Sequence, residues 1–203
     1  YFQTNGKKFK ADENAAKFVG ADEGAILEQK SINGKKYAFD KYGRMKAEWE
    51  QSEATTASAS ISSYAWFQDT TIGAKFANGW FRKIPAEKVD YDNNFDETLK
   101  WFYAKSGKLA KSEIRSINGK KYGFNEMGEM VVGLNAVEYF EEDGKTCAAF
   151  AAIDDADKLA FIDVMDPGKP EVGSVGIYYF SADEDNDGSQ KTGLQTIKVD
   201  GDD

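Results

Sequence analysis

The sequence predicts an all-β protein made of consecutive β-hairpins that form an irregular solenoid. One segment occurs twice, as SINGKKYAFDKYGRM over residues 31–45 and SINGKKYGFNEMGEM over residues 116–130, with ten identical positions. Each copy contains an Asn-Gly turn and aromatic residues at alternate positions. The 4 Trp, 10 Tyr and 14 Phe outnumber the 26 Leu, Ile and Val residues, which disfavours a Leu-rich helical bundle and favours strands.

The two copies of this segment, residues 31–45 and 116–130, are called the strong copies, and they explain how one hairpin would form. Asn33-Gly34 and Asn118-Gly119 suit a two-residue type I′ turn, because both central residues of that turn need a positive φ. Beyond the first turn, Tyr37 and Phe39 alternate with smaller or charged residues, so their rings share one face. A single hairpin is marginal in water, and stacking lets each aromatic face be buried on the next hairpin.

Shorter copies of the same pattern occur along the rest of the chain. Each has an aromatic pair or triplet followed by a turn that contains glycine, and they begin at Tyr1-Phe2, Trp66-Phe67, Trp101-Phe102-Tyr103, Tyr139-Phe140 and Tyr178-Tyr179-Phe180. We therefore expect hairpin repeats over residues 1–49, a loop or linker over residues 50–63, and hairpin repeats with insertions over residues 64–203.

Three stretches depart from the pattern. Residues 51–63 are rich in Ser, Ala and Thr and predict a loop, and residues 84–98 predict an acidic insertion. Residues 147–165 predict two apolar strands, and a short helix over residues 146–153 is the alternative. A turn or two of helix is also open for residues 11–19.

Composition excludes several classes of function. The chain has no histidine, which excludes Ser–His and Cys–His catalysis and histidine-ligated zinc. The net charge of −9 argues against a nucleic-acid partner. The sequence contains no run of 18 apolar residues, so it predicts no insertion into a membrane. Cys147 is the single cysteine, in an apolar run that predicts burial. Because the chain starts at Tyr1 with neither Met nor a signal peptide, we expect a fragment or a processed product.

The strong copies resemble the cell-wall-binding repeat family of Gram-positive surface proteins, which includes choline-binding modules and glucan-binding domains. The matching segments read INGKKYAFDKYGRMKAEW over residues 32–49 and INGKKYGFNEMGEMVVGL over residues 117–134. The family unit is similar to Asn-Gly-Lys, an aromatic triplet, Asp-x-x-Gly-x-Met and a closing Gly-Trp. The closing Trp is present as Trp49 and Trp80, but Leu134 and Leu194 replace it elsewhere. The resemblance implies a hairpin solenoid with a binding role.

Aromatic rings are the candidate ligand-binding groups, because they can stack on sugar faces or surround a quaternary ammonium. For each single ring, a place in the solenoid core is the competing interpretation. The candidates are Trp49, Trp80, Trp101, Trp66, Tyr37 and Tyr122.

An acidic turn near the end of the chain is a weak candidate for a metal site. Asp183, Asp185 and Asp187 place carboxylates at alternate positions and Gly188 follows at the sixth, as in the first half of a calcium loop. The twelfth position is Leu194, where a bidentate Glu would be needed, so we expect a solvated turn and no metal or other cofactor.

Two functions remain open. The first is a non-catalytic module of a secreted bacterial protein at the cell surface or in the cell wall, which binds a cell-wall polysaccharide, a glucan or a choline-decorated polymer through aromatic side chains. The second is a structural stalk or spacer with no ligand of its own. We expect no catalytic residue in this chain, and a catalytic domain elsewhere in a parent protein stays open. Leu134 and Leu194 favour a neutral glycan over choline, and the net charge disfavours a polyanion.

Overall fold

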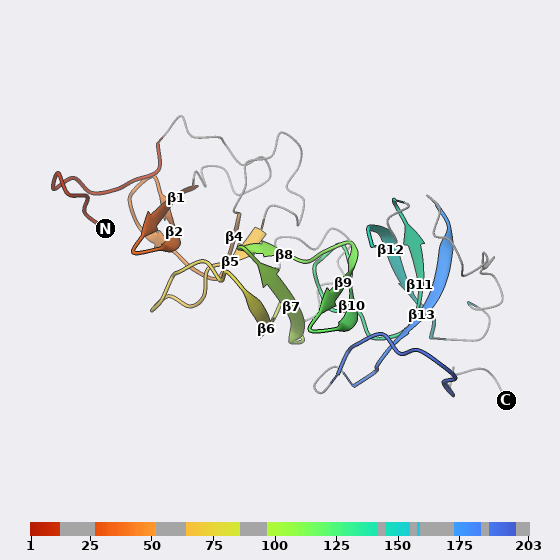
Figure 1. Ribbon diagram of the computed structural model, residues 1–203. Helices are drawn as coiled ribbons and strands as arrows, with labels where there is room; N and C mark the ends of the chain where they lie inside the picture. Colours follow the sequence, from red (N-terminus) through yellow and green to blue (C-terminus); the bar gives the residue numbers. More distant parts are fainter. Residues whose placement is uncertain are drawn as a thin grey trace. The chain divides into compact units, whose positions relative to one another are not determined.

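The architecture is seen in a computed structural model that describes residues 1–12, 27–51, 64–85, 97–141, 145–154, 158, 173–183 and 187–197 (Figure 1). Within those residues, thirteen β-strands form five sheets of two or three strands each. The prediction of an all-β protein made of hairpins is confirmed. None of the described segments is a helix long and apolar enough to cross a membrane.

The chain divides into two compact units. Unit 1 comprises Tyr1–Trp80, Ile84–Thr98 and Ala104–Leu109, and unit 2 comprises Phe81–Lys83, Leu99–Tyr103 and Ala110–Asp203. The division at residues 49 and 63 that the sequence suggested stays a prediction.

Unit 1 contains the first strong copy of the repeat. Its first sheet has the order β1-β2-β3, and a second sheet pairs β4 with β5. The strands are β1 (Leu27–Ile32), β2 (Lys35–Asp40), β3 (Met45–Lys46), β4 (Trp49–Gln51) and β5 (Tyr64–Trp66). A further sheet has the order β6-β7-β8, and the residues of β6 and β7 are divided between the two units. Its strands are β6 (Gly79–Lys83), β7 (Lys100–Lys105) and β8 (Lys108–Leu109).

Unit 2 contains the second strong copy, in which β9 (Glu113–Ile117) pairs with β10 (Lys120–Phe124). A three-stranded sheet follows, in which β11 lies between β12 and β13, as Figure 1 shows. Its strands are β11 (Gly133–Tyr139), β12 (Cys147–Ala152) and β13 (Val175–Phe180).

The predicted Asn-Gly turns are present in both copies. The φ angles are 49° and 76° at Asn33 and Gly34, and 51° and 80° at Asn118 and Gly119. The strands that flank these turns pair directly, as in Ile32 opposite Lys35. Asn and Gly tolerate the left-handed region better than other residues, so the local sequence accounts for both hairpins.

Each unit buries its own group of apolar side chains. In unit 1, Ala38 and Ala65 pack with Phe67, which is fully buried. The corresponding cluster of unit 2 consists of Ile114, Val131, Val137, Tyr139, Cys147 and Phe180. Cys147 is 2% exposed, so the predicted burial of the single thiol is confirmed.

The structure tests only part of what was expected for the irregular stretches. Residues 147–152 form strand β12, so the first of the two apolar strands is confirmed and the helix over residues 146–153 is wrong. The predictions for 13–19, 52–63, 86–96 and most of 155–165 lie outside the described residues.

Candidate functional site

The turn that ends each strong copy has the same backbone hydrogen bonds in both units. The amide of Asp40 donates to the carbonyl of Arg44 at 3.0 Å, and the amide of Asn125 donates to the carbonyl of Glu129 at 3.0 Å. A side-chain Oδ1 also accepts from the last amide of each turn, at 2.9 Å from Arg44 to Asp40 and from Glu129 to Asn125. The two turns therefore share one scaffold while they carry different charges.

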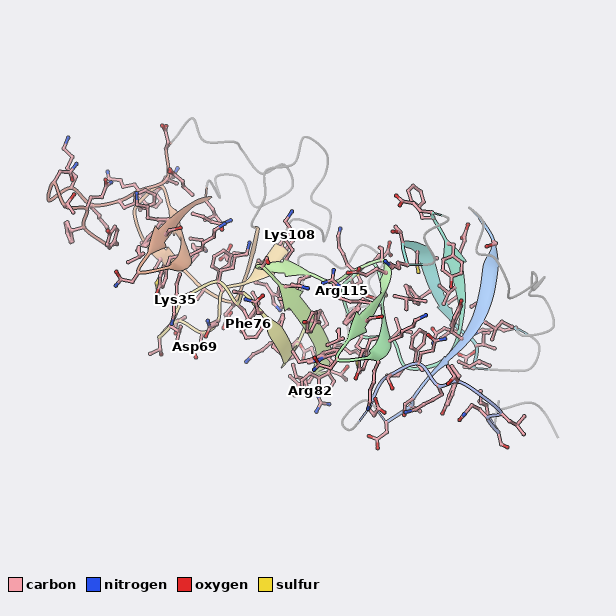
Figure 2. All side chains as sticks on the ribbon, in the orientation of Figure 1. Lys35, Asp69, Phe76, Arg82, Lys108 and Arg115 are labelled. Carbon is pink, nitrogen blue, oxygen red and sulfur yellow. The ribbon has the colours of Figure 1, made fainter. Side chains whose placement is uncertain are left out.

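Each strong copy is joined to a later segment of its own unit in the same way. The carbonyl of Lys36 accepts from the amide of Lys75 at 2.8 Å, and the carbonyl of Lys121, the matching residue of the second copy, accepts from the amide of Gln190 at 2.7 Å. Figure 2 shows Lys35, beside Lys36, together with Asp69 and Phe76 from the following segment of unit 1. In unit 2 the joined segment comes much later in the sequence, after strands β11, β12 and β13.

A methionine closes each of these junctions. The Met45 side chain occupies the space where a Cβ on Gly73 would lie, and the Met130 side chain does the same at Gly188. Gly73 precedes Lys75 by two residues, and Gly188 precedes Gln190 by the same number. Glycine at these positions leaves room for the methionine, which explains why this element of the repeat is retained in both units.

Two of the predicted rings, Trp49 and Trp66, come together in unit 1. They are cross-strand partners in the β4–β5 pair, with ring centroids 5.4 Å apart and planes 66° from parallel. Both are partly buried, and the indole Nε1 of Trp49 donates to the carbonyl of Ile84 at 2.7 Å. The pair therefore forms a corner of two rings, and a hydrogen bond holds the orientation of one of them.

The matching place in unit 2 has a different composition. Leu134 is the residue of the second copy that matches Trp49, and it pairs with Tyr179 across strands β11 and β13. The preceding residues also match, because Glu48 has a φ of 64° and Gly133 a φ of 77°. Leu134 therefore occupies the closing position of the repeat, as the sequence indicated, and the corner of two indoles is absent from this pair.

The other predicted rings are distributed over both units. Tyr37, Trp80, Trp101 and Tyr122 are all partly buried. Tyr37 forms an isolated β-bridge with Ala74, and the guanidinium carbon of Arg82 lies 5.9 Å from the Trp101 ring centroid. Arg82 is labelled in Figure 2. Contact of any of the six rings with a ligand remains a prediction.

In the acidic turn near the end of the chain, Asp187 forms ion pairs with two lysines. Its Oδ2 is 2.8 Å from the Lys191 Nζ and 3.1 Å from the Lys120 Nζ. Hydrogen bonds from Lys191 and then Ser189, with a smaller one from Lys120, hold the pKa of Asp187 well below its usual range. Across the part of the chain that the structure describes, which includes Asp183 but not Asp185, no three His, Cys, Asp or Glu residues are grouped to hold a metal ion.

Several exposed rings are absent from the candidates that the sequence suggested, and one of them, Tyr42, has charged neighbours. Tyr42 is 59% exposed, and the Lys41 Nζ and the Arg44 guanidinium carbon lie 5.1 and 5.0 Å from its ring centroid. The Arg44 Nε donates to the Asp40 Oδ2 at 2.6 Å, which fixes the base of the guanidinium. A comparison of the two strong copies would have indicated this site, because four of their five differences fall within residues 40–44.

Comparison with known proteins gives matches only among solved structures. No protein-family model matches the chain, and no curated protein matches it. The choline-binding domain of Spr1274 from Streptococcus pneumoniae is 24% identical with a TM-score of 0.31, over 56% of this chain and 99% of that one.

Two longer pneumococcal proteins are also similar. The modular autolysin LytC is 24% identical with a TM-score of 0.34, over 81% of this chain, and choline-binding protein F is 16% identical with a TM-score of 0.35, also over 81%. This chain spans 27% of the length of LytC and 41% of that of choline-binding protein F. Two of these three structures, the Spr1274 domain and choline-binding protein F, are named for choline binding.

Proposed function

We propose that this chain is a non-catalytic module that binds a carbohydrate of a bacterial cell wall or cell surface, outside the cell, and that Trp49 and Trp66 form its principal binding site. The corner that these two rings make on strands β4 and β5 is the observation that supports the proposal. Indole faces stack on the C–H faces of sugars, and two faces at an angle can contact one sugar on two sides.

Orientation before binding strengthens this proposal. The hydrogen bond from Trp49 to Ile84 limits the rotation of the indole, so less conformational entropy is lost when a ligand packs on it. A neutral glycan is the preferred ligand, because the corner shows two rings and a choline cage needs about three around one cation.

The stalk remains the second candidate function, and the buried rings favour it. Phe67, Phe102, Phe124 and Phe180 are each no more than 1% exposed, so much of the aromatic content serves as core. A stalk needs only this core, whereas a binding module needs the partly exposed rings as well.

Sedimentation with purified cell walls and with insoluble glucans, with and without free choline, tests the proposal. Trp49→Leu is the matched variant, because Leu134 already occupies the equivalent position in unit 2. We expect binding to a glucan or to walls to weaken by about tenfold or more, equivalent to about 1.4 kcal/mol. Phe140→Ala, which removes a ring that is 61% exposed in unit 2, should leave binding unchanged.

The outcomes separate the candidates. Binding that free choline abolishes would replace the neutral glycan by choline as the ligand. Failure of the unmodified chain to bind walls or glucans would leave the stalk. If Trp49→Leu and Phe140→Ala both bind like the unmodified chain, the site assignment is wrong although the function stands.

A further inference from the structure

Charge is distributed unevenly along the chain. Residues 1–46 contain 10 Lys and Arg and 6 Asp and Glu, a net charge of +4, whereas residues 47–203 contain 16 and 29, a net charge of −13. The total of −9 therefore conceals a basic N-terminal region. Such asymmetry indicates an electrostatic partner for the minority charge, because attraction depends on the local field and not on the total.

The basic region has a defined centre, which we call the Tyr42 cluster and which consists of Lys8, Lys41, Tyr42 and Arg44. The cations of Lys41 and Arg44 lie about the exposed ring of Tyr42. The Lys8 side chain lies against Gly43, the residue between Tyr42 and Arg44, because its Cε is 2.8 Å from the place where a Cβ on Gly43 would lie. All four residues belong to unit 1.

The cluster suits an anion that also has an apolar or hydroxyl-bearing part. Three cations and the single carboxylate of Asp40 leave a local charge of +2. Asp40 is engaged with the Arg44 Nε at 2.6 Å, and the Arg44 side chain is still 71% exposed. Because two protein cations already lie near the Tyr42 ring, it is a poor wall for a quaternary ammonium.

The second strong copy shows that the fold does not require these residues. At its matching positions, Lys41, Tyr42 and Arg44 are replaced by Glu126, Met127 and Glu129, and Asp40 by Asn125. The backbone hydrogen bonds of the turn are nevertheless the same. The turn therefore does not require the charges or the ring of the Tyr42 cluster in order to form.

We propose that the Tyr42 cluster binds the phosphate groups of a linear polyol-phosphate polymer. Lysine ammonium groups attract phosphodiesters as point charges, and an arginine can hold two phosphate oxygens at once. The exposed Tyr42 ring packs against the carbon chain between successive phosphates. Proteins that bind single-stranded nucleic acid stack successive bases on several aromatic side chains, whereas the Tyr42 cluster contains a single ring, so a phosphodiester without bases is the better match.

The test measures binding of poly(glycerol phosphate) to the full chain at 50 and 200 mM salt, by calorimetry or biolayer interferometry. Contact with three cations predicts a slope of about −2 in log K against log salt, so affinity should fall about 16-fold over that range. The key variant combines Asp40→Asn, Lys41→Glu, Tyr42→Met and Arg44→Glu, which gives the first turn the sequence of the second. It should lose binding by at least about tenfold and remain folded, because unit 2 already folds with this turn.

A charge-matched control separates the site from the net charge. Lys105→Glu with Lys121→Gln also lowers the net charge by 3, at exposed positions outside the Tyr42 cluster, and should bind nearly as the unmodified chain does. Trp49→Leu should also bind poly(glycerol phosphate) normally, since this proposal does not depend on the carbohydrate site.

Several results would overturn the proposal. These are no binding of poly(glycerol phosphate), unchanged binding by the turn-exchange variant, or an equal loss in the charge-matched control. Polygalacturonate bound as tightly would show that phosphate is not selected, and single-stranded DNA bound more tightly would show that the polymer class is wrong.

Discussion

Replacing Asp40 with alanine should destabilise unit 1 by removing the acceptor that organises the turn between β2 and β3. The Asp40 Oδ1 accepts from the backbone amides of Tyr42 and Arg44, both at 2.9 Å, and the Asp40 side chain is 11% exposed. Without this carboxylate, the two amides of a tight turn lose their acceptor in the protein.

The magnitude follows from these contacts. Hydrogen bonds to a charged acceptor contribute about 1.5–3 kcal/mol each, and amides at the surface recover part of that from water, so we expect a loss of about 2–4 kcal/mol. The ion pair with Arg44 adds little, because the Arg44 side chain is 71% exposed. Asp40→Asn should cost only about 1 kcal/mol, since the equivalent Asn125 supports its turn through the same Oδ1 atom.

Acid should reduce the cost of Asp40→Ala. Burial raises the pKa of Asp40, but hydrogen bonds from Arg44 and Tyr42 outweigh burial and leave the pKa below its usual value. A lowered folded-state pKa means that the carboxylate stabilises the fold above the unfolded value of about 3.9, and that this stabilisation is lost as the pH falls through the folded-state value. The difference between the unmodified chain and Asp40→Ala should therefore be larger at pH 7 than at pH 3.

Urea unfolding followed by circular dichroism at both pH values is the assay. Asn125→Asp is the reciprocal control in unit 2: it places a second carboxylate beside Glu129, whose Oε2 now accepts from the Asn125 Nδ2 at 3.1 Å, and should itself destabilise. An Asp40→Ala variant as stable as the unmodified chain at pH 7, or with the same deficit at pH 3, would refute the reasoning.

Three further predictions concern unit 2 and its matched positions in unit 1. Gly123→Ala should lower the melting temperature and destabilise the fold by about 1–3 kcal/mol, because the added Cβ would lie 2.8 Å from the Phe180 ring. Ala38→Gly, at the matched position of the first copy, should destabilise the fold by about 1 kcal/mol or less. A larger loss for Ala38→Gly than for Gly123→Ala would contradict this reasoning. Phe180→Ala should lower the free energy of unfolding by about 3–5 kcal/mol, because the Phe180 ring is fully buried, whereas Phe140→Ala, at an exposed ring, should change it by less than about 0.5 kcal/mol. Similar losses in the two variants would show that burial does not determine the cost of removing a ring. Cys147 should react with a thiol reagent only in urea, and rapid reaction in buffer would contradict its burial.

The sequence predicted the local elements well, because their causes are local. Asn33-Gly34 and Asn118-Gly119 prefer positive φ by themselves, so the turns and the faces of the flanking strands follow from a few adjacent residues. The repeat predicted the hairpins, and the closing position correctly matched Trp49 with Leu134. The candidate rings were the four tryptophans and the tyrosine that follows each Asn-Gly turn, and the exposure of a ring does not follow from its type, so Tyr42 was overlooked.

By itself, the sequence determined the all-β class, the position of each strong hairpin and the identity of the closing residue in each copy. Only the tertiary structure decided that Trp49 meets Trp66, that Tyr42 is exposed among cations while Phe67 is buried, and that the second hairpin is joined to Gln190, which is remote in sequence. The physical reason is the range of the interactions. A turn depends on the dihedral preferences of two residues, whereas the exposure of a ring depends on which distant segments pack against it, and many aromatic segments of similar composition could do so.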